Sequence, residues 1–367
     1  MKILENVPIK NLTTMRLGGP ARFVLEIEDQ SEIPEAYDFA KSKNLPVFIL
    51  GGGANTIARD EGFDGVIIKY TKTGIVIDQE NLFEGPPEPG KARMSAPRPW
   101  RRDEATQPEK RFSGHYIITV NAGEPWDNVV AYACKRGLTG IEALSKIPGL
   151  AGAAPVQNIG AYGQELADTF ISARVYDSKD NTFKTLNKKD FGFSYRKSIL
   201  NSTAKNRYLV ISITLSLKKG EMSRPFYNSI EKYIEANHIT DFSPQSIREI
   251  VSTIRADKLP DPAKIPSAGS FFKNIYLTEE QAKAAEEKGY PVYRGHDGLK
   301  INSGWLIEQA GFSDKLIHGI RVNKKAALVL INESAKSYDD LASARAEIID
   351  TIKEKYGYTL EQEPNEI

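Results

Sequence analysis

Two clusters of small residues are the segments whose residue types and spacing could support chemistry. The first, LGGGANT (50–56), follows a stretch that we expect to be a short buried strand, PVFIL (46–50). Consecutive N–H groups without bulky side chains can form a concave site for an anion such as a phosphate. The segment has neither the spacing of a Rossmann fingerprint nor the Gly-Lys-Ser/Thr ending of a P-loop. A tight connection between two strands is therefore the alternative interpretation.

The second cluster is longer and lies in the run IEALSKIPGLAGAAPVQNIGAYGQE (141–165). Its Gly and Ala residues leave little side chain for packing, so the backbone can closely approach a neighbouring element or a flat ligand. Two such clusters in adjacent parts of the chain are consistent with a dinucleotide that lies between two subdomains. The sequence therefore favours a cofactor site formed jointly by both clusters.

The composition excludes several other kinds of site. The chain has 367 residues, of which 40% are hydrophobic and 26% charged, and its formal net charge is +1. This balance argues against a dedicated nucleic-acid or membrane-surface protein. The single cysteine, Cys134, excludes an intramolecular disulfide and a Cys-rich metal site, and the four His residues are widely spaced. We therefore expect no metal, no nucleic-acid partner and no protein partner.

The sequence also lacks the marks of a membrane or exported protein. It has no run of about 18 apolar residues, which a membrane-spanning helix would need. The N-terminal stretch MKILENVPIKNLTT becomes polar too early for a signal peptide. We therefore expect no membrane insertion and a cytoplasmic location.

The elements that must position the two clusters follow an α+β pattern. Strands are predicted at 22–27, 46–50, 65–70, 74–78, 116–122, 170–177, 181–186, 207–217 and 326–332. Helices are predicted at 31–44, 125–136, 226–237, 243–257, 278–288, 302–310 and 337–356. The pattern changes from strand-rich to helix-rich after KKGEMSRP (218–225), which indicates a domain boundary near residue 219.

Residues 79–113 differ in kind from the rest of the chain. Six of the 20 prolines lie between Pro86 and Pro108, basic residues recur, and large apolar residues are few. We predict a long excursion between the strands at 74–78 and 116–122. A solvated loop is the simpler interpretation, and a site for an anion or a partner is the alternative.

The order and spacing of several segments resemble one family of flavoproteins. They are GGGANT (51–56), GFDGVII (62–68), GLTGIEALSKIPGLAGAAPVQNIGAYGQE (137–165), FSYRKSI (193–199), IRADKLPDP (254–262), AGSFFKN (268–274), GWLIEQAGF (304–312), ALVLIN (327–332) and LEQEP (360–364). In these segments the chain is similar to the UDP-N-acetylenolpyruvoylglucosamine reductase family, which belongs to the vanillyl-alcohol-oxidase-type flavoprotein superfamily. A full C-terminal domain with a Tyr at 227 is similar to the type I branch of that family.

The resemblance implies a fold and a domain organisation. The fold class would be α+β, with a two-subdomain FAD-binding fold of the PCMH/VAO type and a C-terminal α+β substrate-binding domain. The domains would be FAD-binding subdomains at 1–70 and 71–218, the second with the Pro-rich insertion, a substrate-binding domain at 219–357, and a segment at 358–367 that returns to the active site. The residues expected to bind FAD are Gly51, Gly52, Gly53, Ala54, Asn55, Thr56, Ile147, Gly149, Gly152, Asn158, Gly160, Ala161, Tyr162 and Gly163.

The resemblance also implies a reaction. In the family, NADPH reduces the flavin, which then passes hydride to the enolpyruvyl double bond of UDP-N-acetylglucosamine enolpyruvate, giving UDP-N-acetylmuramate for peptidoglycan synthesis. Such a reaction needs positive charge or hydrogen bonds on the substrate carboxylate and a proton donor at the carbon beside it. We expect FAD to be bound non-covalently, because neither small-residue cluster contains a His or a Cys.

Three catalytic residues follow from the same resemblance. Arg196 would bind the substrate carboxylate bidentately, Ser270 would donate the proton, and Glu363 would polarise the enolpyruvyl group as an acid. By themselves these residues could instead be a surface arginine, a turn cap and part of an acidic tail. Glu361 is the competing acid, because only four residues follow Glu363.

Further cations and hydrogen-bond donors are expected around the UDP-sugar. The residues that the resemblance assigns to substrate binding are Tyr195, Tyr227, Arg255, Lys258, Asn274 and Lys300. The type I pattern has a lysine where this chain has Ser313, and Lys315 is the candidate replacement.

Two other functions remain open at the level of sequence. Another FAD-dependent oxidoreductase of the same superfamily would keep the two small-residue clusters but lack Arg196, Ser270 and Glu363 together. An inactive relative that binds a flavin or a nucleotide sugar would be consistent with the short C-terminus and with Ser313.

Overall fold

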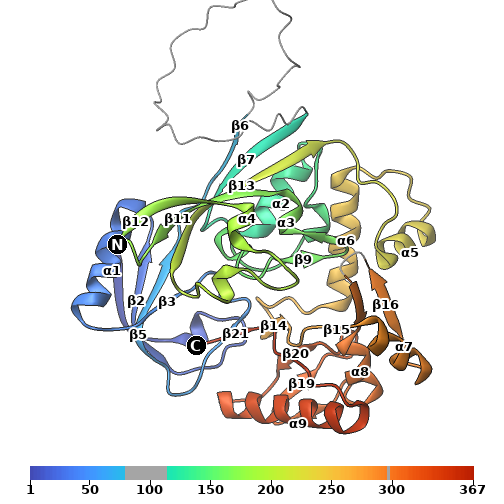
Figure 1. Ribbon diagram of the computed structural model, residues 1–367. Helices are drawn as coiled ribbons and strands as arrows, with labels where there is room; N and C mark the ends of the chain where they lie inside the picture. The colour runs from blue at the N-terminus through green and yellow to red at the C-terminus, as the bar shows by residue number, and fades with distance from the viewer. Residues whose placement is uncertain (79–113, 296–297) are drawn as a thin grey trace, which may run out of the picture.

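In a computed structural model of the protein, the described residues are 1–78, 114–295 and 298–367 (Figure 1). The excursion expected at 79–113 and the side chain of His296 lie outside these residues. The helices and strands expected elsewhere are present, with ends shifted by a few residues. None of the helices in the described ranges is long and apolar enough to cross a membrane.

The first sheet is built from the N-terminal part of the chain. Strands β2 (Pro20–Ile27), β5 (Phe63–Tyr70) and β3 (Val47–Ile49) run parallel, and β1 (Lys2–Pro8) pairs with β2 at the edge in the antiparallel direction. Helix α1 (Ile33–Ser42) forms the crossover between β2 and β3, as parallel pairing requires. The central strands are apolar along almost their whole length because both faces are covered.

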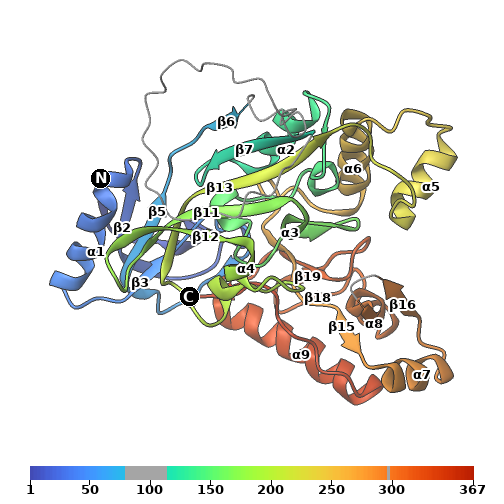
Figure 2. The ribbon, with the colours of Figure 1, turned by 45° about the horizontal axis from the view of Figure 1, so that its top comes forward.

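A larger antiparallel sheet lies beside the first (Figure 2). Its strand order is β12 (Thr182–Asn187), β11 (Phe170–Asp177), β13 (Tyr208–Lys219), β7 (His115–Asn121) and β6 (Ile75–Asp78), and β8 (Leu138–Thr139) pairs with the end of β13. One hydrophobic core contains buried side chains from both sheets, such as Leu25, Ile68, Val120 and Ile213. The two sheets therefore form a single rigid base for the small-residue clusters.

The second small-residue cluster forms short turns over the end of a helix. The elements are α2 (Trp126–Cys134), the 3-10 turns η3 (Glu142–Leu144) and η4 (Ala151–Ala153), β9 (Gly160–Ala161), β10 (Gln164–Glu165) and α3 (Leu166–Thr169). Trp126 fixes this path, because its backbone N–H donates to Gly149 O at 3.0 Å and its indole N–H to Leu144 O at 3.1 Å. The backbone of the cluster is thereby left exposed to a cavity rather than covered by side chains.

Two helices that follow the predicted boundary near residue 219 pack on earlier residues. Helices α5 (Asn228–Ala236) and α6 (Pro244–Lys258) form an apolar pair, and α6 lies along α2 and η3. Arg248 on α6 makes a bidentate ion pair with Asp127 on α2, with N–O distances of 2.6 and 2.9 Å. The domain boundaries remain a prediction. Helix α6 packs on α2 and η3, which precede the predicted boundary, and α5 packs on α6.

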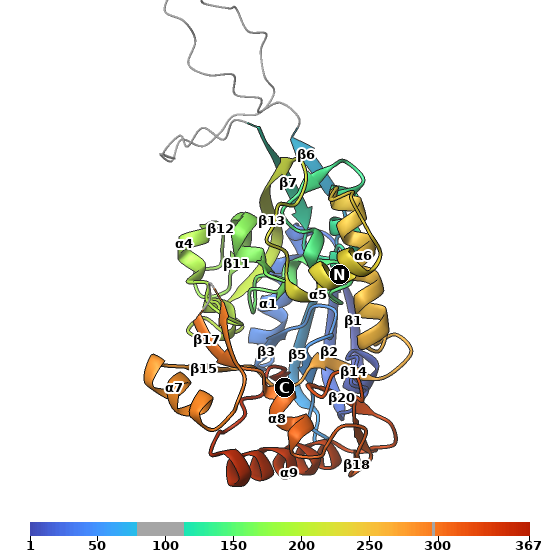
Figure 3. The ribbon, with the colours of Figure 1, turned by 90° about the vertical axis from the view of Figure 1, so that its right-hand side faces the viewer.

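The remaining elements form a C-terminal α+β unit below the two sheets (Figure 3). One sheet has the order β14 (Ser267–Ser270), β20 (Val329–Asn332), β19 (Ile320–Val322) and β18 (Leu316–Ile317), and another has β15 (Ile275–Leu277), β17 (Gly298–Ile301) and β16 (Val292–Gly295). Helices α7 (Glu279–Glu287), α8 (Ser303–Gln309) and α9 (Tyr338–Tyr356) cover them. Phe271, Phe272, Leu306 and Ile348 are buried in their common core.

The chain ends by returning to its beginning. The short strand β21 (Asn365–Glu366) pairs in parallel with β4 (Thr56–Ile57), which directly follows the first small-residue cluster. The N–H of Asn365 donates to Asn55 O and that of Ile367 to Ile57 O, both at 3.0 Å. The C-terminal segment 358–367 is therefore part of the wall around the cluster, as Figure 1 shows for the C-terminus beside β21.

Candidate active site

One cavity brings together the segments that the sequence singles out. The predicted residues in its wall are Gly51, Gly52, Gly53, Ala54, Asn55, Thr56, Ile147, Gly149, Gly152, Gly160, Arg196, Arg255, Ser270 and Glu363. They come from the first sheet, the turns after α2, the connection between β12 and β13, helix α6, strand β14 and the C-terminal segment. The tertiary structure thus gathers both small-residue clusters and all three catalytic candidates around one space.

The two small-residue clusters meet in the wall of this cavity. A Cβ atom on Gly52 would lie 3.3 Å from Cα of Gly149, and one on Gly51 would lie 2.9 Å from Cβ of Ala153. These short distances mean that the two clusters are in close contact at these points, and that side chains there would push them apart. At Gly53 a side chain is excluded for another reason: the residue has a φ of +66°, and a Cβ atom would clash with the carbonyl of Leu12.

Four residues expected to bind FAD lie outside the wall of the cavity. Asn158 is 1% exposed, its amide donates to Glu165 Oε2 at 2.6 Å, and its Oδ1 accepts the N–H of Ala167 at 2.9 Å. Ala161, Tyr162 and Gly163 form the hairpin between β9 and β10. These contacts hold the second cluster in shape, and direct contact with FAD stays a prediction for the four residues.

Arg196 lies in a tight turn that aims its side chain at the cavity. Ser194 and Lys197 exchange two backbone hydrogen bonds at 3.1 Å, and Arg196 between them has a left-handed φ of 52°. A non-glycine residue in this region carries backbone strain, which is common at functional sites. Arg196 Nη2 donates to Gly160 O at 3.0 Å, and this contact ties the guanidinium to the second small-residue cluster.

Glu363 is the carboxylate that meets Arg196. Arg196 Nε donates to Glu363 Oε1 at 3.0 Å, and Gln157 Nε2 donates to the same oxygen at 3.0 Å. The side chain of Glu363 is 8% exposed, and its N–H donates to Phe271 O at 2.9 Å. Burial raises the pKa of Glu363, and the positive charges of Arg196 and Lys273 only partly offset it. A carboxyl group in this state is suited to act as an acid.

The competing acid, Glu361, faces away from the cavity. Its side chain is 72% exposed and forms an ion pair with Lys273. Glu361 is not among the residues that line the cavity, whereas Glu363 is. The geometry therefore favours Glu363 over Glu361.

Ser270 enters the cavity from the C-terminal unit. It is the last residue of β14, pairs with Val329 of β20, and follows Gly269, whose φ is +72°. Phe271 then turns into the core and donates its N–H to Leu328 O at 2.7 Å. This alternation directs the hydroxyl to the cavity wall while the two phenylalanines anchor the strand.

A second polar group lies where α6 meets the hairpin between β9 and β10. Arg255 lines the cavity and is hydrogen-bonded to Tyr162, whose ring packs edge-on against Tyr227 at 5.7 Å between centroids. Burial lowers the pKa of Arg255 and raises that of Tyr162. Among the described residues, the buried Nε of Arg255 has no hydrogen-bond acceptor. An anionic ligand would satisfy it.

Three more candidates for substrate binding form a group next to Arg196. The rings of Tyr195 and Tyr276 are 4.7 Å apart, and the ammonium of Lys300 lies about 6 Å from both ring centres, at 6.0 and 5.8 Å. The N–H of Asn274 approaches the hydroxyl of Tyr195 at 3.4 Å, and the amide oxygen of Asn274 accepts the N–H of Ser303 at 3.2 Å. This group extends the positive charge of the Arg196 region.

The lysines at two other expected positions lie elsewhere. Lys258 is exposed at the end of α6, where its carbonyl accepts a hydrogen bond from Asn323 at 3.0 Å. Lys315 pairs with Glu347 on α9 at 3.3 Å, and Ser313 donates to Lys324 O at 3.1 Å. Neither Lys258 nor Lys315 lines the cavity, so their contact with a substrate stays a prediction.

Residues of the cavity that the sequence did not single out include Gln157 and Asn206. Gln157 connects Glu363 with Asn55, whose amide donates to Gln157 Oε1. Asn206 accepts the N–H of Ile49 at 3.3 Å, so it joins the second subdomain to β3. Gln157 lies within the small-residue run and was detectable there, whereas Asn206 has no sequence pattern around it.

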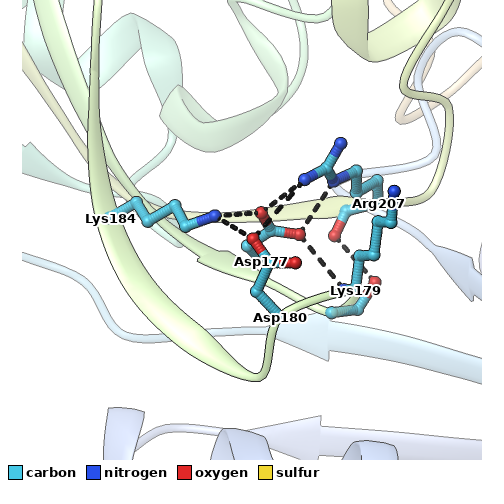
Figure 4. A network of polar contacts seen from close by, with 6 residues as sticks. Asp177, Lys179, Asp180, Lys184 and Arg207 are labelled. Atoms are coloured by element: carbon cyan, nitrogen blue, oxygen red, sulfur yellow. Dashed lines mark hydrogen bonds and ion pairs between the residues drawn. The ribbon is translucent and has the colours of Figure 1, made fainter.

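An ion-pair network forms around the buried Asp177 and includes Arg207, the residue that follows Asn206 in the chain (Figure 4). Asp177, at the end of β11, is fully buried, and both of its carboxylate oxygens accept hydrogen bonds from the guanidinium of Arg207 at 2.8 Å. Lys184 and the N–H of Lys179 bind the same carboxylate at 2.6 and 3.1 Å. Arg207 holds the pKa of Asp177 well below its usual range. The network holds Arg207 in place, and thereby the adjacent Asn206 in the cavity wall.

The fold and the site together define a class of protein. The family model described as the FAD binding domain matches residues 110–187, which include the second small-residue cluster. The cavity wall contains the backbone of both small-residue clusters, at positions where side chains are absent, and this fits FAD. The chain is an FAD-binding oxidoreductase.

Comparison with known proteins identifies the family within this class. The model described as the C-terminal domain of UDP-N-acetylenolpyruvoylglucosamine reductase matches residues 261–367. The UDP-N-acetylenolpyruvoylglucosamine reductase of Ralstonia nicotianae is 33% identical over 99% of both chains. That of Pseudomonas aeruginosa is 30% identical over 100% of this chain and 99% of its own. The chain belongs to the UDP-N-acetylenolpyruvoylglucosamine reductase family.

A solved structure supports the fold. The crystal structure of UDP-N-acetylenolpyruvylglucosamine reductase from Thermus caldophilus matches with a TM-score of 0.62 and 21% identity, over 100% of this chain and 98% of that one. The α+β architecture predicted from the sequence, an FAD-binding fold followed by a C-terminal α+β unit, is thereby confirmed.

Proposed function

We propose that this protein reduces UDP-N-acetylglucosamine enolpyruvate to UDP-N-acetylmuramate, with NADPH as the hydride donor and non-covalently bound FAD. The observation that carries the proposal is the meeting of Arg196, Ser270 and Glu363 in the wall of one cavity. These residues come from three distant parts of the chain, and the cavity also contains both small-residue clusters. The proposal is supported further by relatives of that name which match along the whole chain.

The bound flavin supplies the hydride, and the side chains supply the charge and the proton. Arg196 holds the substrate carboxylate, where negative charge develops as hydride adds to the double bond. Ser270 delivers a proton to the carbon next to that carboxylate. A serine hydroxyl is a weak acid, so it depends on positive charge and on an ordered position, which β14 and the nearby guanidinium provide.

The position of Glu363 beside Arg196 explains how substrate binding can favour the protonated form of Glu363. Among the described residues, Glu363 is the carboxylate hydrogen-bonded to the Arg196 side chain, and burial already raises its pKa. A substrate carboxylate at Arg196 would add a second negative charge close to Glu363. Like charges in one site raise the pKa of one of the groups, so substrate binding favours a protonated Glu363 that can polarise the enolpyruvyl group.

The UDP part of the substrate is expected on the cationic side of the cavity. Arg255, with Tyr162 and Tyr227 beside it, offers a buried guanidinium to a diphosphate. Lys300, close to Tyr195 and Tyr276, offers a second positive charge. NADPH uses the same cleft in alternation with the UDP-sugar. We further infer a cytoplasmic protein that acts on these small molecules in peptidoglycan synthesis.

A test in two half-reactions checks the proposal directly. The purified protein is expected to be yellow and to bleach when NADPH is added without oxygen. Subsequent addition of UDP-N-acetylglucosamine enolpyruvate should restore the colour in a single turnover. Bleaching by NADPH without recovery on adding this substrate would instead indicate another flavin-dependent oxidoreductase, and a colourless protein that takes up no FAD would indicate an inactive relative.

A further inference from the structure

We propose that Arg345 on helix α9 is a positioning residue for Glu363, which it holds in the cavity through the neighbouring Gln362 and Glu366. The inference rests on the proposed function, because it concerns the acid of that reaction. Arg345 itself does not line the cavity. It acts from the other side of the C-terminal segment 358–367.

The side chain of Arg345 contacts residues on both sides of Glu363. Its Nη1 donates to Gln362 Oε1, one residue before Glu363, and to Glu366 Oε2 at 3.4 Å, three residues after it. Its Nη2 donates to the hydroxyl of Tyr338 at 3.2 Å, which orients the guanidinium on its own helix. The planar guanidinium can serve several acceptors in fixed directions, which a lysine cannot do.

Gln362 completes the clamp around Glu363. Its Nε2 donates to Pro364 O at 2.9 Å, so the same amide group binds Arg345 and the backbone just beyond Glu363. Phe272 forms an isolated β-bridge with Gln362, next to the bond between Glu363 N and Phe271 O. The segment is thus held by backbone pairing on the cavity side and by Arg345 on the α9 side.

The clamp supplements a short stretch of regular pairing in this segment. After Glu363, β21 pairs with β4 over only two residues, Asn365 and Glu366. Segments with little regular pairing open locally more easily unless side chains hold them. Arg59 also reaches Glu366, at 2.6 Å, but its side chain is 60% exposed, whereas that of Arg345 is 23% exposed. The less exposed Arg345 is therefore the stronger restraint on the segment.

The burial of Glu363 makes this restraint chemically important. The charged and titratable groups that face Glu363 are Arg196 and Tyr195 from the turn before β13, and Lys273 after β14. Burial raises the pKa of Glu363 against the effect of the two cations. A looser segment would admit water to the carboxyl group, and its pKa would fall towards the ordinary value. Glu363 would then be deprotonated over more of the working pH range.

The test compares Arg345→Met and Arg345→Lys with Arg22→Met in the full FAD-loaded protein. Arg22 forms an exposed ion pair with Asp64 at 3.0 Å, which involves no residue of the C-terminal segment, and serves as the matched control. The rates of flavin reduction by NADPH and of reoxidation by UDP-N-acetylglucosamine enolpyruvate are measured separately against pH. Amide hydrogen exchange of residues 362–366 is followed in the same proteins.

For Arg345→Met we expect the rate of flavin reduction by NADPH to stay within about 2-fold of wild type. The rate of reoxidation should fall by about 10- to 100-fold, because a small misplacement of the Glu363 carboxyl group can have an effect of this size. The decline of reoxidation with rising pH should move to lower pH, and residues 362–366 should exchange faster. Arg345→Lys should lie between Met and wild type. Arg22→Met should match wild type in all measurements.

Two outcomes would overturn the inference. One is an Arg345→Met protein with unchanged reoxidation, pH profile and exchange. The other is an equal slowing of both half-reactions together with loss of FAD, which would indicate a role in overall folding. If the wild-type protein itself is never reoxidised by the substrate, the proposed function fails instead, and the exchange of residues 362–366 still decides whether Arg345 clamps the segment.

Discussion

Arg196 and Glu363 form an ion pair with 3.0 Å between Nε and Oε1, although 167 residues separate them in the chain. Their side chains are 19% and 8% exposed, so the pair lies mostly out of water. Charges in such surroundings interact strongly but are costly to bury. The pair therefore links the chemistry of the cavity to the position of the C-terminal segment, and several expectations follow from it and from the surrounding wall.

Replacing Glu363 by Gln tests its role as an acid. Glu363→Gln keeps the size of the side chain but removes the transferable proton, so reoxidation by the UDP-sugar should slow by about 10²- to 10⁴-fold. Reduction of the flavin by NADPH should remain close to wild type. In wild type, reoxidation should fall as the pH rises through the raised pKa of Glu363, since the protonated form is lost. This decline should be missing in the variant, as stopped-flow rates across the pH range would show.

Glu361→Gln is the matched control for this prediction. The Glu361 side chain is exposed and paired with Lys273 outside the cavity. Both half-reactions should therefore be preserved. A larger loss with Glu361→Gln than with Glu363→Gln would reverse the assignment of the acid.

Replacing Ser270 by Ala separates the proton from the hydride. The hydroxyl at the end of β14 is expected to act only after hydride addition begins, so flavin reduction by NADPH should be nearly intact. Reoxidation should fall by about 10²-fold or more. Single-turnover absorbance measurements distinguish the two steps. Equal damage to both half-reactions would contradict the role as proton donor, because it would point to a general disturbance of the cavity.

Gly52 offers a test of the cofactor cradle. A Cβ at this position lies 3.3 Å from Cα of Gly149, so Ala should be tolerated with small adjustments, whereas Leu should force the two clusters apart and distort the cavity wall. We expect Gly52→Leu to weaken FAD binding at least about tenfold, equivalent to about 1.4 kcal/mol. Titration of the deflavinated proteins with FAD measures the effect. Unchanged affinity in the Leu variant would mean that the contact between the clusters does not shape the FAD site.

The buried network around Asp177 predicts a change in stability. Asp177→Asn removes the charge that pairs with Arg207 and Lys184, and should lower the free energy of unfolding by about 2 kcal/mol, measured by urea denaturation of the FAD-free protein. Because the pKa of Asp177 is lowered in the folded state, the difference should be full at neutral pH. It should shrink as the pH falls below about 4, the value of an unfolded aspartate.

Asp180→Asn provides the comparison within the same network. Asp180 is 45% exposed and contacts the same Lys184, and exposed pairs contribute about 0–1 kcal/mol. Similar losses for the two variants would show that burial of Asp177 is not what makes its pair stabilising. Because Arg207 adjoins Asn206 in the cavity wall, FAD affinity should also fall in Asp177→Asn and not in Asp180→Asn.

Local sequence patterns determined the elements and the kind of cofactor site. Period-2 and period-3.6 patterns located strands such as β13 and helices such as α9, because these patterns reflect which face of an element is buried. The runs of glycine and alanine at 50–56 and 149–163 indicated backbone that closely approaches a ligand or a neighbouring element, since their residues lack large side chains. Such features are contained within short stretches of chain and can be recognised there.

The tertiary structure decided which residues share the site and in what state. It distinguished buried Glu363 from exposed Glu361, directed Arg255 into the cavity while leaving Lys258 at the surface, and packed α6 on α2 across the predicted boundary. It also tied the short C-terminus to Arg345. The physical reason is that burial, pKa and pairing depend on neighbours that can lie far away in the chain, as Gln157 does at 206 residues from Glu363, and a local pattern of residues contains no information about them.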